Sequence, residues 1–416
     1  MPPRGFDRGG HSRRQFLTRA GLAALGGPAL LAACTREPGR GVTTVKGAEP
    51  LKLASPQNPV RWNINPGNEP IKDGMAPEKN ATLQVYNYAD YLDPGGVKAF
   101  GQKYGCKVQL STFNDMDEAL TKIRQGSVPF DIWIGPGYDL TSRLITTSLI
   151  RPLNHSYIPN IKNVWPVFTN PWYDQGWQYT IPYTVYTTGI GWRLDKVPVD
   201  IAKLPNPYDT LWNPEFKNQT AVLDDYRSTI EMCLLRAGIT DVNTDKAGDL
   251  DKAAAQLTEL TKNTDPKITI SMYSDLPAGA YGQAAMWSGD VVNAAWDGAA
   301  PPEVFRYWFP ADGKGMVDND LVVAPAGGKN PVLAHLFLNH LLDLKVATGN
   351  LNFTGYQPPQ VTLKPETLIE QEFIPSNLTS VVVKESDFKV GYPALELSTE
   401  ASNAWHSIWL AFKAGN

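Results

Sequence analysis

Two stretches of alternating strand and helix patterns constrain the fold of this 416-residue chain most strongly. The first stretch has strands at 82–88, 107–112 and 130–134, separated by helices at 97–104 and 116–125. The second has strands at 219–223, 291–296 and 320–324 and helices at 226–237, 246–262 and 331–344. Strands that alternate with helices pair in parallel, so we predict two α/β lobes.

An extended segment, residues 179–192, joins the two stretches and predicts strand-like crossings between the lobes. We place the first lobe at 81–185 plus about 321–365, and the second at 186–320 plus about 366–416. Ligands of open α/β sheets bind beyond the carboxyl ends of the strands. The loops after Tyr86, Ile134, Leu223 and Trp296 are therefore expected to face one interlobe cleft.

The amino terminus reads as an export signal rather than as part of the fold. Arg13 and Arg14 precede an apolar run over residues 20–33, which is shorter than the roughly 20 residues that span a bilayer. The arginine pair resembles a twin-arginine signal, and Leu31-Ala-Ala-Cys34 resembles a bacterial lipobox. We expect residues 1–33 to be removed, Cys34 to be acylated, and the Pro/Gly-rich residues 34–80 to form a tether to the membrane's outer face.

Charge narrows the classes of ligand. The whole chain carries a net charge of −4, and the first 33 residues contribute five arginines against one aspartate. The exported part is therefore more acidic than the whole chain, which disfavours nucleic acid and favours a cationic ligand. Three cysteines cannot form a disulfide framework.

A series of short segments resembles the spermidine/putrescine-binding proteins of bacterial ABC importers over about residues 81–360. In order, they are Tyr86-Asn-Tyr-Ala-Asp-Tyr91, Phe130-Asp-Ile-Trp-Ile134, Ile181-Pro-Tyr-Thr184, Gly189-Ile-Gly191, Leu211-Trp-Asn-Pro-Glu-Phe-Lys217, Leu223-Asp-Asp-Tyr-Arg227, Trp296-Asp-Gly298, Asp320-Leu-Val-Val-Ala-Pro325 and Gly355-Tyr356. The resemblance implies a type II periplasmic-binding-protein fold whose two lobes close on a polyamine. It also implies a membrane permease as partner.

The resemblance implies a set of cleft residues. Aromatic walls would come from Tyr88, Tyr91, Tyr138, Trp296 and Tyr356, and ammonium-binding carboxylates from Asp225 and Asp320. Three features depart from the family pattern. Ser228 stands where a second acid is usual, Asp318 stands where a tryptophan is usual, and the segment after Trp296, residues 299–303, is shorter than the family's helix. Asp318 is either a compensating acid or a solvated loop residue, so the particular amine stays open.

The residue chemistry supports a polyamine site independently of the resemblance. A chain of ammonium groups separated by methylenes needs spaced carboxylates, with aromatic faces between them. Structural roles compete with this interpretation. The aromatic residues could pack in the core, Asp225 could cap the helix that starts at Tyr226, and Asp320 could belong to a turn.

Other classes of protein have weaker support. The histidines are scattered, Cys106 and Cys233 have no partner motif, and no nucleophile elbow or phosphate loop occurs. We therefore expect a monomeric binding protein without enzymatic activity, metal or cofactor. A same-fold receptor for another amine, an amino acid, a sugar or ferric iron remains the alternative.

Overall fold

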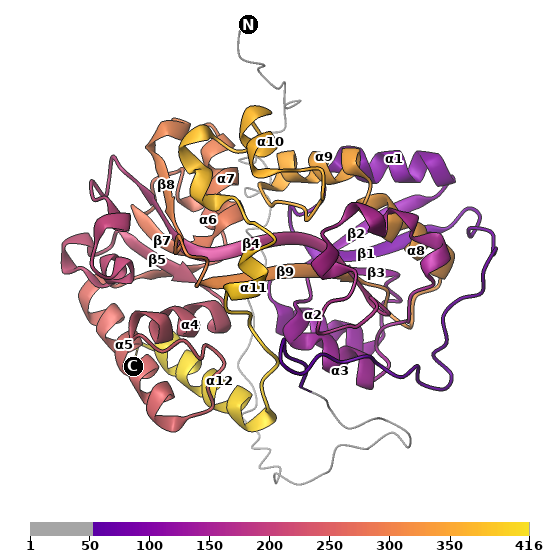
Figure 1. The fold of residues 1–416 in the computed structure, drawn as a ribbon, viewed down its shortest axis with the longest axis horizontal. Coiled ribbons are helices and arrows are strands. Elements are labelled where there is room, and N and C mark those ends of the chain that lie inside the picture. The colour runs from indigo at the N-terminus through magenta and orange to yellow at the C-terminus, as the bar shows by residue number, and fades with distance from the viewer. Residues whose placement is uncertain (1–52, 416) are drawn as a thin grey trace, which may run out of the picture. The chain divides into compact units, whose positions relative to one another are not determined.

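The computed structural model describes residues 53–415 (Figure 1), so the predicted signal peptide and Cys34 lie outside the described residues. A mixed nine-stranded sheet runs through this part of the chain in the order β2-β1-β3-β9-β4-β7-β5-β6, and β8 pairs with β4. The strands are β1 (Thr82–Tyr88), β2 (Lys107–Phe113), β3 (Ile132–Ile134), β4 (Thr180–Arg193), β5 (Thr220–Leu223), β6 (Lys267–Thr269), β7 (Gln283–Trp287), β8 (Phe305–Trp308) and β9 (Met316–Val323).

Helices cover both faces of the sheet (Figure 1). They are α1 (Pro94–Tyr104), α2 (Met116–Gln125), α3 (Thr141–Thr146), α4 (Tyr226–Arg236), α5 (Ala247–Thr264), α6 (Met272–Asp275), α7 (Ser288–Trp296), α8 (Pro331–Leu341), α9 (Leu344–Thr354), α10 (Pro365–Glu370), α11 (Asp387–Val390) and α12 (Thr399–Lys413). The predicted α/β class is thus confirmed.

The first half of the sheet is parallel, as the sequence predicts. β1 lies between β2 and β3 and pairs in parallel with both. Asp93 starts α1 by accepting hydrogen bonds from the backbone N–H groups of Gly95 and Gly96, and Asp115 caps α2 in the same way. These caps fix where each strand-to-helix turn leaves the sheet.

In the second half of the sheet, one strand was predicted at the wrong place. β5 pairs in parallel with β6 and β7, but the predicted strand at 291–296 is part of helix α7. The strand lies just before it, at Gln283–Trp287. A short apolar run does not distinguish a buried strand from a buried helix, which explains the error. Trp287, not Trp296, therefore ends the strand.

Two long strands join the halves. The predicted extended segment is β4, which pairs antiparallel with β9 from Thr180↔Val323 to Thr188↔Met316. β9 begins at Met316 rather than at Asp320, so Asp318 and Asp320 lie inside a strand and not in a turn. The three lobe boundaries that we predict from the sequence fall within β4, β9 and α10, and they stay a prediction.

Part of the predicted tether packs on the α/β body. Trp62 is 3% exposed, and its indole Nε1 donates to the carbonyl of Tyr173. Glu78 accepts hydrogen bonds from the backbone N–H groups of Val332 and Leu333 at the start of α8. Residues 53–80 contain no named helix or strand, and they contact the body at Trp62 and Glu78. The role of residues 34–80 as a tether stays a prediction.

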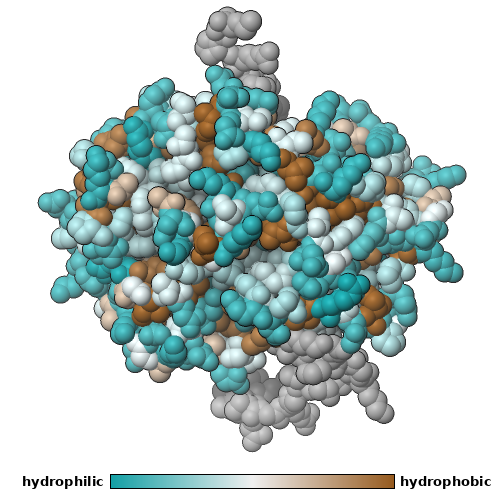
Figure 2. All heavy atoms as spheres, in the orientation of Figure 1, coloured by the Kyte–Doolittle hydropathy of each residue, from teal (hydrophilic) through white to brown (hydrophobic). Residues whose placement is uncertain are grey.

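The described surface is mostly hydrophilic on the face shown in Figure 2, where apolar residues form separate patches. Exposed large hydrophobic side chains are spread along the chain from Leu53 to Leu410. Between residues 53 and 415, no helix combines the length and the apolar character that crossing a bilayer requires.

Candidate ligand-binding site

A cavity of about 300 Å³ lies where the strands of both halves end. The loops after β1, β2, β3, β5, β6 and β7 line it, together with residues of β4 and β9. This is the edge at which open α/β sheets bind ligands, and the volume is at the lower end of the usual range for small-molecule sites.

Most of the residues that the sequence suggests meet at this cavity. Seven of the nine line it: Tyr88, Tyr91, Asp225, Ser228, Asp318, Asp320 and Tyr356. They come from segments as far apart as β1 and the turn after α9. Because these seven residues line one cavity, a single ligand could contact several of them. Their contact with a ligand remains a proposal.

Tyr138 and Trp296 do not line this cavity. The Tyr138 hydroxyl donates to the carbonyl of Val317, and its ring stacks on Tyr173 beside a second space of about 30 Å³. Trp296 lies at the end of α7, 40% exposed, with its Nε1 donating to the carbonyl of Phe373. The error for Trp296 follows from reading α7 as a strand.

Asp320 is the most enclosed of the predicted carboxylates. It is 8% exposed, and it accepts hydrogen bonds from the hydroxyls of Tyr91 at 2.6 Å and Tyr186 at 3.2 Å. Burial raises the pKa of Asp320 to about 7, although the two tyrosine hydroxyls oppose this rise. A cation bound here would stabilise the charged form that burial disfavours.

Asp318 lies on the same face of β9 as Asp320, two residues earlier. The backbone N–H of Ala394 donates to Asp318 at 3.4 Å, and Asp318 lines the cavity. Burial raises its pKa to about 6. Of its two predicted roles, a cavity carboxylate agrees with this position and a solvated loop residue does not.

Asp225 serves as a helix cap, as one interpretation of the sequence expected. Its carboxylate accepts the backbone N–H of Ser228 at 2.8 Å and so starts α4. The same side chain lines the cavity. Capping and ligand contact are compatible because a carboxylate has several acceptor positions.

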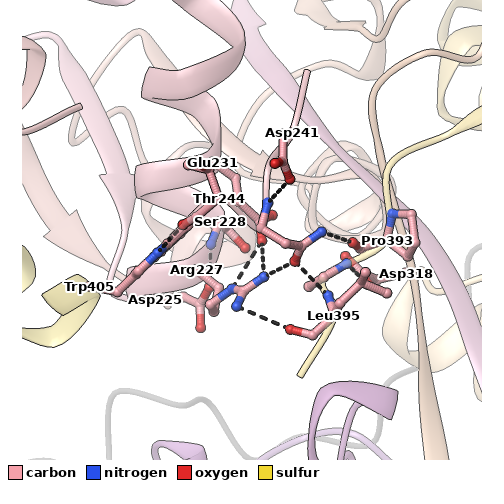
Figure 3. Close-up of polar contacts among 12 residues, drawn as sticks. Asp225, Arg227, Ser228, Glu231, Asp241, Thr244, Asp318, Pro393, Leu395 and Trp405 are labelled. Carbon is pink, nitrogen blue, oxygen red and sulfur yellow. Dashed lines mark hydrogen bonds and ion pairs between the residues drawn. The ribbon is translucent and has the colours of Figure 1, made fainter. Parts of the chain in front are cut away.

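Arg227 and Glu231, on the helix that Asp225 caps, form a buried ion pair that the sequence did not single out (Figure 3). Arg227 is 6% exposed and binds Glu231 through both Nε and Nη2. It also donates to the side chain of Asn243 and to the carbonyl of Leu395, and its guanidinium lies over the ring of Trp405. This network joins α4 to the segment that precedes α12.

Aromatic rings line one side of the cavity. Tyr91 makes edge contacts with Tyr88 and Tyr356, and Tyr186 makes edge contacts with Tyr356 and Trp287. Sequence reasoning missed Tyr186 and Trp287. Tyr186 could have been found from its position within the extended segment that crosses between the lobes. Trp287 could have been found from its position at the end of a strand.

Asp290 is a further cavity carboxylate that the sequence did not reveal. It lies in the first turn of α7 and is 3% exposed. The Tyr356 hydroxyl donates to Oδ1 at 2.9 Å, whereas Oδ2 is buried without a hydrogen-bond partner in the described part of the chain. Burial raises the pKa of Asp290 to about 7.

The cavity is strongly acidic. Among the described residues, Arg227 is the one basic side chain that lines it, together with nine acidic residues: Asp90, Asp115, Asp139, Asp224, Asp225, Glu231, Asp290, Asp318 and Asp320. Arg227 already pairs with Glu231, so the remaining charge is negative. Among residues 53–415, no three His, Cys, Asp or Glu side chains are arranged as metal ligands. The arrangement therefore suits an organic cation with apolar carbon between its charges.

Comparison with known proteins defines the class. The sequence profile of the bacterial extracellular solute-binding proteins matches residues 96–367, so the chain belongs to this family. Its fold is that of type II periplasmic binding proteins. A solved structure from Listeria monocytogenes, described as a putative spermidine/putrescine ABC transporter, is similar with a TM-score of 0.70 and 27% identity. The match covers 80% of this chain and 99% of that one.

The names of two relatives also state the ligand that each of those proteins binds. The spermidine/putrescine-binding periplasmic protein 1 of Haemophilus influenzae is 28% identical over 68% of this chain and 77% of its own length. The putrescine-binding periplasmic protein PotF of Escherichia coli is 29% identical over 65% of this chain and 76% of its own length.

Proposed function

We propose that this protein is the extracytoplasmic solute-binding component of a bacterial ABC importer and that its ligand is a polyamine. One observation carries the proposal: the enclosed carboxylate of Asp320 faces an aromatic-lined, acidic cavity whose one guanidinium is already paired. The names of the relatives from Haemophilus influenzae and Escherichia coli support the same ligand class.

The cavity can bind an alkyl polyamine through two kinds of contact. An ammonium group donates hydrogen bonds to Asp320, each contributing roughly 1.5 to 3 kcal/mol when one partner is charged. Contact of a cation with the faces of Tyr88, Tyr91 or Trp287 adds roughly 0.5 to 2 kcal/mol. A few such contacts together account for micromolar or tighter binding. Because the cavity takes residues from both halves of the sheet, ligand binding favours the closed arrangement.

Other solutes fit the cavity less well. An anionic solute needs a free cation, and Arg227 is committed to Glu231. A sugar needs no excess of carboxylates. Ferric iron prefers tyrosinate, but burial raises the pKa of Tyr88, Tyr91 and Tyr356 well above the usual value and so keeps their hydroxyls protonated.

A thermal-shift screen tests the ligand class. The exported part of the chain is heated alone and with putrescine, cadaverine, spermidine, spermine, glutamate, lysine and glucose. We expect the aliphatic polyamines to raise the melting temperature in proportion to the logarithm of their concentration, because they bind only the folded state. A rise with glucose or glutamate and none with any polyamine would contradict the proposal.

Location and partner belong to the same proposal. We infer attachment to the outer face of the cytoplasmic membrane through acylated Cys34, and delivery of the ligand to a permease driven by ATP hydrolysis in another subunit. Cys34→Ala is expected to release the protein from the membrane fraction or to leave its precursor unprocessed. Normal processing together with unchanged membrane fractionation of the variant would contradict the anchor.

A further inference from the structure

The turn after β3 presents an acid, not an aromatic ring, to the cavity. Tyr138 and Asp139 are neighbours in a short 3₁₀ turn, Tyr138–Leu140. Tyr138 is not among the residues that line the cavity; its hydroxyl donates to the carbonyl of Val317 and also interacts with the carboxylate of Asp318, whereas Asp139 lines the cavity. The side chain that this turn offers to a ligand is therefore a carboxylate.

Asp139 differs from neighbouring carboxylates in having no hydrogen-bond donor within residues 53–415. Asp224 pairs with Lys413 at 2.7 Å, Glu231 pairs with Arg227, and Asp225 accepts the N–H of Ser228. Burial, together with the negative charges of Asp318 and Asp225, raises the pKa of Asp139 to about 6, against the opposing effect of Arg227 and Arg143. The carboxylate thus lies near other acids without a direct partner.

Arg227 does not supply the missing partner. Its guanidinium donates to Glu231, Asn243 and the carbonyl of Leu395, and it lies over the Trp405 ring (Figure 3). These contacts use most of the five N–H donors of an arginine. The positive charge of Arg227 makes the potential around Asp139 less negative, but Arg227 donates no hydrogen bond to the Asp139 carboxylate, which can therefore accept one from another group.

An independent sign of a ligand comes from Asp290 elsewhere in the same cavity. Asp290 is 3% exposed, and its Oδ2 is buried without a hydrogen-bond partner among the described residues. Buried polar atoms are normally paired, and an unpaired carboxylate oxygen is especially unfavourable. Within residues 53–415, the cavity therefore contains unpaired carboxylate oxygens at two places, on Asp139 and on Asp290. A ligand with several hydrogen-bond donors could pair with both.

We propose that Asp139, together with Asp318, holds a second ammonium group apart from the one at Asp320, so that the protein selects ligands with a cationic group at each end. This inference rests on the proposed function and specifies its substrate class. Asp318 and Asp320 are residues i and i+2 of β9 and so lie on one face of it, and regular strand geometry separates such Cα atoms by about 6.8 Å. This spacing suits a short aliphatic diamine lying along the strand.

The first test removes the charge of Asp139 and keeps its shape. Putrescine binding is measured by isothermal titration for wild type, Asp139→Asn and the control Asp117→Asn. The Asp117 side chain is 81% exposed on α2 and lies outside the cavity. Asp117→Asn therefore changes the net charge by the same amount as Asp139→Asn without altering the cavity. We expect Asp139→Asn to weaken binding at least fivefold relative to the control. A smaller loss overturns the role of Asp139.

Folding is checked by thermal unfolding without ligand. Asp139→Asn removes a charge that has no partner, so the variant should unfold at the same temperature as wild type or higher. A purely structural role predicts a lower unfolding temperature and an unchanged affinity of the folded protein. That result overturns the inference.

The second test uses wild type, so it does not depend on a variant that folds. Putrescine is compared with N-acetylputrescine, which has a similar chain but only one ammonium group. We expect at least tenfold weaker binding of the acetylated ligand, and a smaller preference in Asp139→Asn. Equal affinities in wild type overturn the two-cation requirement while leaving the proposed function standing. Failure of wild type to bind any polyamine overturns the proposed function itself.

Discussion

The hydroxyl of Tyr91 donates a 2.6 Å hydrogen bond to Oδ2 of Asp320, linking the loop after β1 to β9 across 229 residues of sequence. The same hydroxyl lies 2.6 Å from Oγ1 of Thr184 on β4. Tyr91 therefore ties the central strands to the first half of the sheet and stabilises the charged form of Asp320.

Tyr91→Phe should weaken ligand binding by raising the pKa of Asp320 further. We expect roughly 3- to 10-fold lower affinity at pH 7, corresponding to about 1 kcal/mol. The difference should shrink at pH 9, where Asp320 is ionised in both proteins. Titration calorimetry at the two pH values measures this. Tyr307→Phe, which removes a buried hydroxyl outside the cavity, is the matched control, and an equal loss in both variants would contradict a specific role for Tyr91.

The two tryptophans of the β7–α7 segment should differ in effect. Trp287 lines the cavity, and Trp296 is exposed at the far end of α7. Trp287→Leu is expected to lower affinity by about 1 to 2 kcal/mol, because an aromatic face is lost but some apolar cover remains. Trp296→Leu should bind within twofold of wild type. The opposite order in a fluorescence or calorimetric titration would restore the sequence-based assignment of Trp296.

Affinity should rise with pH. Burial raises the pKa of Asp139 and Asp318 to about 6 and of Asp320 to about 7, so the empty cavity holds protons that a bound ammonium ligand displaces. We expect roughly 10- to 30-fold tighter binding at pH 8 than at pH 5, with proton release on binding. Titrations in buffers of different ionisation enthalpy count those protons, and an affinity that is flat over this range contradicts the prediction.

The same carboxylates affect the stability of the free protein in the opposite direction. A carboxyl whose pKa is raised by folding binds its proton more tightly in the folded state. Its contribution to the free energy of unfolding is therefore present at acid pH and is lost as pH rises through about 6 to 7.

The buried pair of Arg227 and Glu231 should matter for stability. Arg227→Met leaves Glu231, which is 1% exposed, without its counter-charge. We expect the free energy of unfolding to fall by about 3 kcal/mol or more. Replacing both residues by methionine should recover most of the loss, since the double variant contains no unpaired buried charge. Urea unfolding of the three proteins measures this, and a double variant as unstable as the single one would contradict the account.

Local sequence signals predicted the parts of the fold that depend on neighbouring residues. The strands and helices between residues 82 and 134 follow alternating apolar positions and Asp caps such as Asp93, which act within a few residues. Asp225 was predictable as a cap for the same reason. The strand-end rule placed the loop after Leu223 at the cleft, and the resemblance to a family singled out Asp225 within that loop.

Other features depend on packing between distant segments. The apolar run at 291–296 was read as a strand although it belongs to α7, so Trp287, which ends the true strand β7, was overlooked in favour of Trp296. Which of the adjacent side chains Tyr138 and Asp139 faces the cavity is set by the contact with Val317 on β9. The i, i+4 spacing of Arg227 and Glu231 reads as an ordinary surface pair on a helix. Their burial follows from contacts with a segment about 170 residues away.

The most direct test of the central claim is an isothermal titration of putrescine into wild type and Asp320→Asn at pH 8. Wild type is expected to show one binding site of micromolar or tighter affinity. In the variant, the loss of charge at an enclosed position should weaken binding by about 2 to 4 kcal/mol, roughly 30- to 1,000-fold. An absence of binding in wild type, or equal affinity in a correctly folded Asp320→Asn protein, would contradict the assignment of this cavity as a polyamine site.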